Sequence, residues 1–405
     1  MKYFSYLNTS KTILQLYKGD QPFGIFIKDF FRQHKKYGSK DRKQISHLCY
    51  CYFRTGKIFN GYSLEDAIIG ALFLCTTAAN DMLQHLNAEW NAKATMGISE
   101  KCNLLGVTLA DIFPWMSELS NEVDKEKFCQ SLLIQPDLFL RIRPGFHKAV
   151  TSKLEKSGIS FEMEGQCIRL FNSTKIEEIF IPDQEVVIQD YNSQQVGKFF
   201  QNAFANISMD EGSANVTRAK PAVWDCCAAS GGKSIMLYDL LPAIHLTVSD
   251  VRKNILLNLA KRFEAAGIKK YRSFVVDLAG EKVRPGERYN LIIADAPCSG
   301  SGTWARTPEQ LFYFNAAEID RYSQLQKKIV KNIVPCLSDS GKLVYITCSV
   351  FKKENEELVK FLQNECGLQL ESMSLLKGYE KKADTLFVAV LSRKGNNDQQ
   401  QNLQS

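Results

Sequence analysis

The feature that most constrains the fold is an alternation of short apolar runs and longer amphipathic segments in the C-terminal half of the chain. The apolar runs predict strands at residues 222–226, 244–249, 272–276, 290–294 and 342–347. The amphipathic segments predict helices at residues 233–241, 252–266 and 321–337. Such alternation is typical of a doubly wound, largely parallel sheet. In these sheets, ligands bind beyond the carboxyl ends of the strands.

Two of the predicted strands lead to a cysteine that is followed by a serine. The run 290–294 continues into Asp295, and Cys298 follows in a glycine-rich loop, whereas the run 342–347 leads directly to Cys348. One thiol at a strand end is more often an inert core residue, but two such ends beside an acid favour chemistry. We therefore predict that the two sulfur atoms face a single pocket.

A loop rich in small residues, 225–234, follows the first predicted strand and leads into a helix. Small residues let the backbone approach a ligand closely, and a helix N-terminus offers unpaired N–H groups. The loop has only the second half of a P-loop, because positions 226 and 227 are cysteines, and the dinucleotide fingerprint Gly-x-Gly-x-x-Gly is absent. The sequence therefore favours an adenosyl ligand without a pyrophosphate.

Acidic residues stand at three predicted strand ends in a row. Asp250 is placed to accept hydrogen bonds from both ribose hydroxyls, as the acidic residue of dinucleotide sites does. Asp277 is placed to bind the adenine amino group, and Asp295 ends the next strand. A single aspartate in such a position is more often a turn residue, but three of them after a small-residue loop favour a cofactor site.

Composition narrows the classes of protein further. The 405 residues, of which 45% are hydrophobic and 23% charged, suffice for two or three ordinary globular domains. No run approaches the ~20 apolar residues of a membrane span and no signal peptide is evident, so we expect a cytoplasmic protein without a membrane partner. The twelve cysteines include no Cys-x-x-Cys pair and the five histidines are scattered, so we expect no metal site. Five cysteines lie in or beside apolar helical patterns and are expected to be core thiols: Cys49, Cys51, Cys75, Cys336 and Cys366. A monomer is the simplest expectation.

The N-terminal part of the chain predicts two further domains. Residues 1–124 are expected to form an all-helical domain, in which a basic segment is either a solvated helix face or a site for a polyanion such as RNA. Its cations are Lys28, Arg32, Lys35, Lys36, Lys40, Arg42, Lys43, Arg54 and Lys57.

Residues 125–190 predict a small α+β domain with strands at 138–143, 159–163, 167–171 and 185–188 and a helix at 146–156. Within it, Arg141 and Arg143 are expected either to be exposed on one strand face or to contact a phosphate. Residues 191–394 would then form the doubly wound domain, and residues 395–405 a disordered tail.

Three segments resemble the Sun (Fmu) family of RNA cytosine-5 methyltransferases, which use S-adenosylmethionine. They are Asp-x-Cys-Ala-Ala-x-Gly-Gly-Lys at 225–233, Asp-Ala-Pro-Cys-Ser-Gly at 295–300 and Tyr-Ile-Thr-Cys-Ser at 345–349. The resemblance covers nearly the whole chain, and within the family the chain is similar to the small-subunit ribosomal RNA methyltransferase B group. It implies a multidomain α/β protein with a NusB-like RNA-binding helical domain, a small RRM-like α+β domain and a class I (Rossmann-like) methyltransferase domain.

The resemblance also implies the roles of single residues. The implied cofactor contacts are Cys227, Ala228, Ala229, Ser230, Gly231, Gly232, Lys233, Asp250, Asp277 and Asp295. Carbon 5 of cytosine becomes reactive when a thiolate adds to carbon 6. In the family, the cysteine after threonine attacks the base, and the cysteine after proline assists release of the product. The resemblance therefore implies that Cys348 is the nucleophile and that Cys298 assists product release. Asp295 would bind the cytosine. Because DNA cytosine methyltransferases use a Pro-Cys nucleophile, the sequence alone leaves the order of the cysteines open.

Three features depart from the family pattern. Ser230 stands where proline is usual, Arg143 where asparagine is frequent, and Asp-Thr-Leu-Phe at 384–387 where the family has Asp-Gly-Phe-Phe. The implied function is formation of 5-methylcytosine in small-subunit ribosomal RNA. The alternatives are a transfer RNA or DNA cytosine-5 methyltransferase, or a non-catalytic RNA-binding factor of ribosome assembly.

Overall fold

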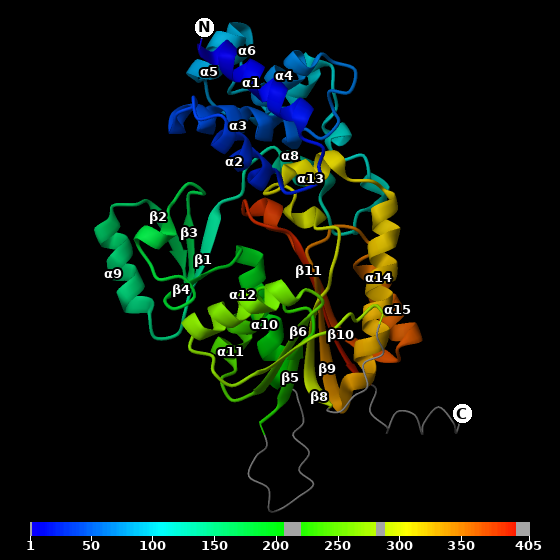
Figure 1. The fold of residues 1–405 in the computed structure, drawn as a ribbon. Helices are drawn as coiled ribbons and strands as arrows, with labels where there is room; N and C mark the ends of the chain where they lie inside the picture. The colour runs from blue at the N-terminus through cyan, green and yellow to red at the C-terminus, as the bar shows by residue number, and fades with distance from the viewer. Residues whose placement is uncertain (1, 206–219, 281–287, 394–405) are drawn as a thin grey trace, which may run out of the picture. The chain divides into compact units, whose positions relative to one another are not determined.

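The computed structural model describes residues 2–205, 220–280 and 288–393, which group into two compact units (Figure 1). The first unit comprises Met1–Leu119, Val123–Pro136 and Thr303–Ala316. The second comprises Ser120–Glu122, Asp137–Gly302 and Ala317–Ser405. The predicted tail, residues 395–405, lies outside the described residues.

The first unit is built from helices. These are α1 (Lys2–Leu16), α2 (Phe23–Gln33), α3 (Ser39–Arg54), α4 (Leu64–Cys75), α5 (Asp81–Leu86), α6 (Ala88–Ala92), α7 (Ile98–Leu105), α8 (Lys125–Leu132) and α13 (Pro308–Tyr313), with the short 3-10 helices η1 (Leu109–Ile112) and η2 (Met116–Glu118). Arg54 is buried and donates a hydrogen bond to the carbonyl of Ala305. This arginine therefore serves the packing of the helical unit and does not belong to a solvated basic face.

The second unit contains a small antiparallel sheet of strand order β2-β3-β1-β4. Its strands are β1 (Leu138–Ile142), β2 (Phe161–Glu164), β3 (Cys167–Leu170) and β4 (Val186–Ile188), and α9 (His147–Ser157) and η3 (Ile176–Glu178) accompany them. Alternate strand residues such as Leu140, Ile142 and Ile168 are buried against Val150 and Leu154 of α9. Burial of one sheet face under an amphipathic helix explains why this short segment folds.

The second unit also contains a seven-stranded sheet of order β10-β11-β9-β8-β5-β6-β7. Its strands are β5 (Ala222–Asp225), β6 (His245–Asp250), β7 (Arg272–Val275), β8 (Tyr289–Asp295), β9 (Leu337–Thr347), β10 (Leu368–Leu376) and β11 (Leu386–Arg393). Strands β5 to β9 pair in parallel, so the predicted doubly wound, largely parallel sheet is confirmed. The antiparallel pairs of β11 with β9 and β10 were not predicted.

Helices cover both faces of this sheet. Figure 1 shows α10 (Tyr191–Ala205), α11 (Gly232–Leu240) and α12 (Lys253–Ala265) on one side, and α14 (Ala317–Ile333) and α15 (Glu356–Glu365) on the other. The prediction of a helix over 321–337 was wrong at its end. Pro335 lies in the 3-10 helix η5 (Val334–Cys336), and β9 begins at Leu337, because proline cannot continue an α-helix.

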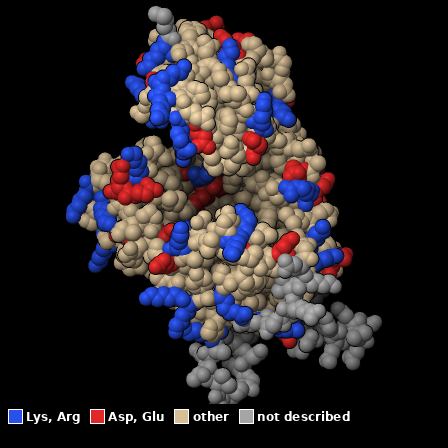
Figure 2. Space-filling model, in the orientation of Figure 1, with Lys and Arg blue, Asp and Glu red and all other residues tan. Residues whose placement is uncertain are grey.

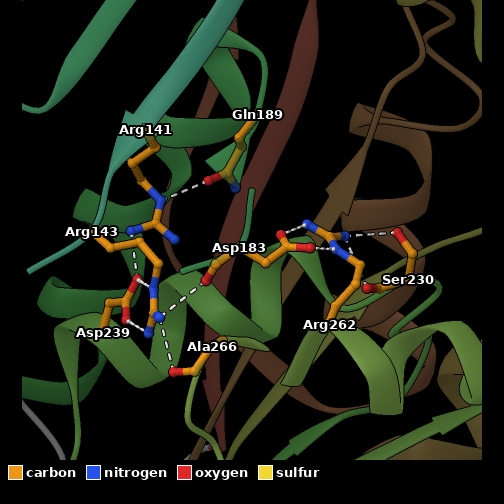
Figure 3. A network of polar contacts seen from close by, with 8 residues as sticks. All are labelled: Arg141, Arg143, Asp183, Gln189, Ser230, Asp239, Arg262 and Ala266. Atoms are coloured by element: carbon orange, nitrogen blue, oxygen red, sulfur yellow. Dashed lines mark hydrogen bonds and ion pairs between the residues drawn. The ribbon is translucent and has the colours of Figure 1, made fainter. Parts of the chain in front are cut away.

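Both expectations for Arg141 and Arg143 were wrong, because the two side chains are buried in a network of ion pairs and hydrogen bonds (Figure 3). One nitrogen of each guanidinium lies 2.7 Å from a carboxylate oxygen of Asp239 in α11. Arg141 also donates to the Gln189 side chain, and Arg143 to the carbonyl of Ala266 at 2.8 Å. The two arginines thus fasten the small sheet to the helices of the large sheet.

None of the helices in the described part of the chain is long and apolar enough to cross a membrane.

Replacing Asp239 by asparagine should destabilise the second unit, because both buried guanidinium groups lose their carboxylate. Removing one partner of a buried ion pair costs about 3–5 kcal/mol, so thermal unfolding followed by circular dichroism should begin roughly 10 °C lower. The matched control is Asp339→Asn, since Asp339 is 83% exposed and pairs with Arg288 and Arg393 at the surface. Equal losses in the two variants would contradict this role of Asp239.

Candidate active site

The carboxyl ends of β8 and β9 bring Cys298 and Cys348 together. Asp295 aligns with Ile346 in the parallel pair, so both chain segments leave the sheet at the same edge. The two Sγ atoms lie 3.3 Å apart. Between the two segments, the Gly302 N–H donates to the Cys348 carbonyl at 2.9 Å. A Cβ on Gly302 would lie 2.0 Å from the carbonyl oxygen of Thr385, so this close approach requires glycine.

The electrostatic surroundings of Cys298 and Lys233 fix the charge states of these two groups at neutral pH. The contact with Cys348 raises the pKa of the Cys298 thiol well above its ordinary value, and burial adds to this shift. Cys298 therefore keeps its proton at neutral pH. Lys233 Nζ lies 2.7 Å from Asp295 Oδ2. Burial lowers the pKa of Lys233, whereas the charges of Asp295 and, less strongly, Cys348 raise it. The net shift of the Lys233 pKa is upward, so the lysine remains a cation.

The loop between β5 and α11 is held by hydrogen bonds to the next strand. The Ala228 N–H donates to the Ser249 carbonyl at 2.9 Å, and the Ala229 N–H donates to Asp250 Oδ2 at 3.1 Å. Ala229 and Gly231 have φ values of +46° and +83°. A Cβ on Gly231 would lie 2.8 Å from the Phe263 ring, so the loop needs glycine there both for its conformation and for packing.

Asp250 and Asp277 both lie at strand ends, but their surroundings differ. Asp250 is buried, and its Oδ1 accepts hydrogen bonds from the backbone N–H and the Nε of Arg252. Burial raises the pKa of Asp250, but the bonds from Arg252 outweigh it and the net shift is downward. Asp277 is exposed and accepts a hydrogen bond from the Ala279 N–H at 2.9 Å. Both carboxylates thus shape their own turns.

A pocket of about 420 Å³ lies at this edge of the sheet, within the size range of small-molecule sites. Six of the predicted site residues line it: Cys227, Ala229, Asp250, Asp277, Asp295 and Cys298. The other predicted residues lie outside this lining; they are Ala228, Ser230, Gly231, Gly232, Lys233 and Cys348. Lys233 and Cys348 reach the pocket indirectly, through their contacts with Asp295 and Cys298.

Sequence reasoning missed the apolar wall of the pocket, which α14 supplies through Tyr322, Leu325 and Ile329. Their spacing of three and four residues places them on one helix face, and this periodicity was the available signal. Sequence reasoning also missed Arg252 and the buried Glu354, which contacts both cysteine-bearing segments. Among the described residues, no group of three or more His, Cys, Asp or Glu side chains is placed to hold a metal ion.

Ser230, which stands where the resembled family has proline, is fixed by an arginine. Arg262 of α12 donates from Nη1 to the Ser230 carbonyl at 2.9 Å and to its Oγ at 3.1 Å (Figure 3). The same guanidinium pairs with Asp183, which precedes β4 of the small sheet, at 2.7 Å. The small sheet and α12 thus hold the backbone of the loop that a proline ring would otherwise stiffen.

The sheet order, the loop after its first strand and the pocket at the carboxyl ends define a class I methyltransferase with a Rossmann-like fold. Residues 216–399 match the family model described as 16S rRNA methyltransferase RsmB/F, so this domain is similar to that family. The match to a methyltransferase family supports S-adenosylmethionine as the cofactor, as the resemblance implied.

The curated relatives are named as ribosomal RNA small subunit methyltransferases. The chain is 27% identical over 242 residues to the probable ribosomal RNA small subunit methyltransferase B of Bacillus subtilis, covering 58% of this chain and 51% of the relative. It is 29% identical over 209 residues to ribosomal RNA small subunit methyltransferase B of Xanthomonas campestris, covering 47% and 48%. The chain spans about half the length of these relatives.

Solved structures share the fold. A structure titled "Crystal Structure of PH0851" has a TM-score of 0.65 at 17% identity and covers 92% of this chain and 95% of its own. NSun6 from Pyrococcus horikoshii, solved with SFG, has a TM-score of 0.57 at 14% identity and covers 69% and 97%. At these identities the likeness establishes the architecture of the chain.

Replacing Arg262 by methionine should weaken S-adenosylmethionine binding about tenfold, which corresponds to roughly 1.4 kcal/mol, because the loop at Ser230 loses its charged hydrogen-bond donor. Adding Ser230→Pro to this variant should restore most of the affinity, since the ring fixes the backbone by itself. Isothermal titration calorimetry measures both changes. Lys261→Met, which removes the neighbouring exposed cation, is the control. Undiminished affinity in Arg262→Met would refute this role of Arg262.

Proposed function

We propose that the protein transfers a methyl group from S-adenosylmethionine to carbon 5 of cytosine in small-subunit ribosomal RNA, through a covalent bond to Cys348. The observation that carries the proposal is the pair of sulfur atoms 3.3 Å apart, next to the Lys233–Asp295 ion pair. One thiol at a strand end has many explanations. A second thiol in contact with it, beside a pocket of cofactor size, matches a reaction that needs one sulfur to attack and another group to complete the turnover.

The residues around the pocket fit the proposed cofactor. The small-residue loop gives backbone access at Cys227 and Ala229, and Asp250 and Asp277 offer carboxylates at successive strand ends. Tyr322 and its neighbours on α14 offer an apolar surface for a planar ring. When bound, S-adenosylmethionine would supply an electrophilic methyl group on a sulfonium.

The protein's own side chains and water account for the remaining steps. The Cys348 sulfur, as a thiolate, adds to carbon 6 of the base. Asp295 accepts a hydrogen bond from the cytosine amino group, which uracil lacks. Water takes the proton from carbon 5, the electrons of that bond re-form the double bond between carbons 5 and 6, and the bond from carbon 6 to the Cys348 sulfur breaks. Cys298, which is protonated at neutral pH, donates its proton to the departing Cys348 sulfur and regains a proton from solvent.

The basic segment of the helical unit supports the proposed RNA partner. We propose that this helical unit is a NusB-like RNA-binding domain. Of its nine cations, Lys28, Arg32, Lys35, Lys36, Lys40, Lys43 and Lys57 are exposed. Figure 2 shows Lys and Arg side chains grouped on the surface of this unit. Clustered cations bind the phosphate backbone with an affinity that falls as salt concentration rises. Contacts with phosphates position the RNA without reading its sequence, so the choice of the target base depends on the pocket.

The function is tested by two linked measurements. Transfer of labelled methyl groups from S-adenosylmethionine to small-subunit ribosomal RNA, followed by nucleoside analysis, should yield 5-methylcytidine. Bisulfite sequencing of RNA from a deletion strain should then show the position that has lost its methyl group. Labelling of transfer RNA or DNA instead would redirect the substrate assignment. Salt-sensitive RNA binding without any methyl transfer would identify a non-catalytic assembly factor.

The two cysteines should differ in the effects of their removal. Cys348→Ala should lower methyl transfer by more than ~10⁴-fold, because the covalent route loses its nucleophile. Cys298→Ala should accumulate a protein–RNA adduct that survives denaturing gel electrophoresis, because product release is blocked. Cys366→Ala, which removes a partly exposed thiol after α15, is the control. Normal turnover in Cys348→Ala would reject the assignment.

A further inference from the structure

Each of the two site cysteines is followed by a serine, and the proposed chemistry gives these serines no role. Ser299 and Ser349 are both buried. Their hydroxyl oxygens lie 3.1 Å apart, and the hydroxyl of Ser301 bonds to both. The repeated Cys-Ser pair therefore places a cluster of hydroxyl groups directly behind the two thiols.

A single buried carboxylate joins this cluster. Glu354, which is fully buried between β9 and α15, accepts a hydrogen bond from the Ser299 N–H at 2.9 Å through Oε2. Its Oε1 accepts a hydrogen bond from the Ser349 hydroxyl at 2.6 Å. One side chain thus bonds to the residue after Cys298 and to the residue after Cys348.

Further bonds fix the orientation of Glu354. The Gln326 amide of α14 donates to Glu354 Oε2 and to the Pro297 carbonyl, each at 3.0 Å. The Tyr345 hydroxyl of β9 donates to the backbone carbonyl of Glu354 at 2.8 Å. The carboxylate is therefore held from α14 and from both cysteine-bearing segments, and the Glu354 backbone is held from β9.

Placing a carboxylate here is costly. Burial raises the pKa of Glu354, and its side-chain partners in the described part of the chain are neutral donors. A buried acid without a cation lowers stability unless several hydrogen bonds offset its desolvation. Apolar residues or a second amide would fill the same volume at lower cost, so packing alone does not account for an acid at this position.

We propose that Glu354 is the positioning residue that sets the separation of the two site thiols. Its carboxylate accepts hydrogen bonds from the Ser299 N–H and from the Ser349 hydroxyl, so it fixes both cysteine-bearing segments to one point. The separation follows from the geometry alone. Its consequence for catalysis rests on the proposed function, because only that reaction needs both sulfur atoms at one base.

The test compares Glu354→Ala and Glu354→Gln with the unaltered protein. Glutamine keeps the size and one carbonyl acceptor, so it should retain part of the effect. The control is Glu357→Ala, which removes an exposed carboxylate three residues away. If Glu354→Ala does not fold, Glu354→Gln and Ser349→Ala carry the test. Glutamine keeps the volume of the side chain, and Ser349→Ala removes the hydroxyl that bonds to Glu354 with little change in volume.

The first readout is bridging of the two thiols by diamide. In this reaction the two sulfur atoms form a disulfide, and the azo oxidant takes up their two hydrogens. Peptide mass spectrometry follows the Cys298–Cys348 bridge, which should form fast in the unaltered protein and about 100-fold more slowly in Glu354→Ala, if the sulfurs move apart by roughly 1 Å. A general loss of stability, measured separately by thermal unfolding, would not produce selective slowing in a folded variant.

The second readout is methyl transfer. The kcat of Glu354→Ala should fall about 100-fold, with unchanged affinity for S-adenosylmethionine, because Glu354 is not among the residues that line the pocket. Folded variants with unchanged bridging and unchanged kcat would overturn the inference while leaving the proposed function intact. Glu354-dependent bridging in a protein that never methylates RNA would uphold the positioning role and reject the proposed function.

Discussion

The parallel pairing of β8 with β9 is the interaction on which the candidate site depends. Its register places Asp295 beside Ile346, and the Ala296 N–H extends the ladder by donating to the Ile346 carbonyl at 2.9 Å. Both segments then leave the sheet at one edge, where Cys298 and Cys348 meet. A shift of one residue would turn one of the two chains toward the other face of the sheet and separate the thiols.

Several ionisable groups are buried at the carboxyl ends of the parallel strands, and the charges of neighbouring residues offset part of the cost of their desolvation. Lys233 and Asp295 form a close pair, and Arg252 offsets the burial of Asp250. Burial raises the pKa of Asp225, at the start of the loop between β5 and α11, to about 7, although its carboxylate accepts a hydrogen bond from the Ser234 hydroxyl. A concentration of buried, shifted groups beside a pocket is characteristic of functional sites. The pocket edge of the sheet holds these groups together.

Local periodicity was enough to predict the parallel strands, their order along the chain and the residues at their carboxyl ends. Contacts between distant residues were not predictable in this way. Arg141 alternates with apolar neighbours, as an exposed strand residue would, and its partner Asp239 lies 98 positions away. Glu354 stands in the charged run 352–357, which resembles the solvated start of a helix. Its burial follows only from the meeting of β9, α14 and the Cys298 segment.

The account is tested most directly by locating the covalent bond to RNA. Cytosine-5 chemistry stalls on RNA that carries 5-fluorocytidine, because fluorine replaces the proton that must leave carbon 5. Digestion of the trapped complex with protease and nuclease, followed by mass spectrometry, identifies the modified peptide. We expect a methylated fluorocytidine nucleotide on Cys348. A nucleotide on Cys298, or no adduct with an RNA that the protein otherwise methylates, would contradict it.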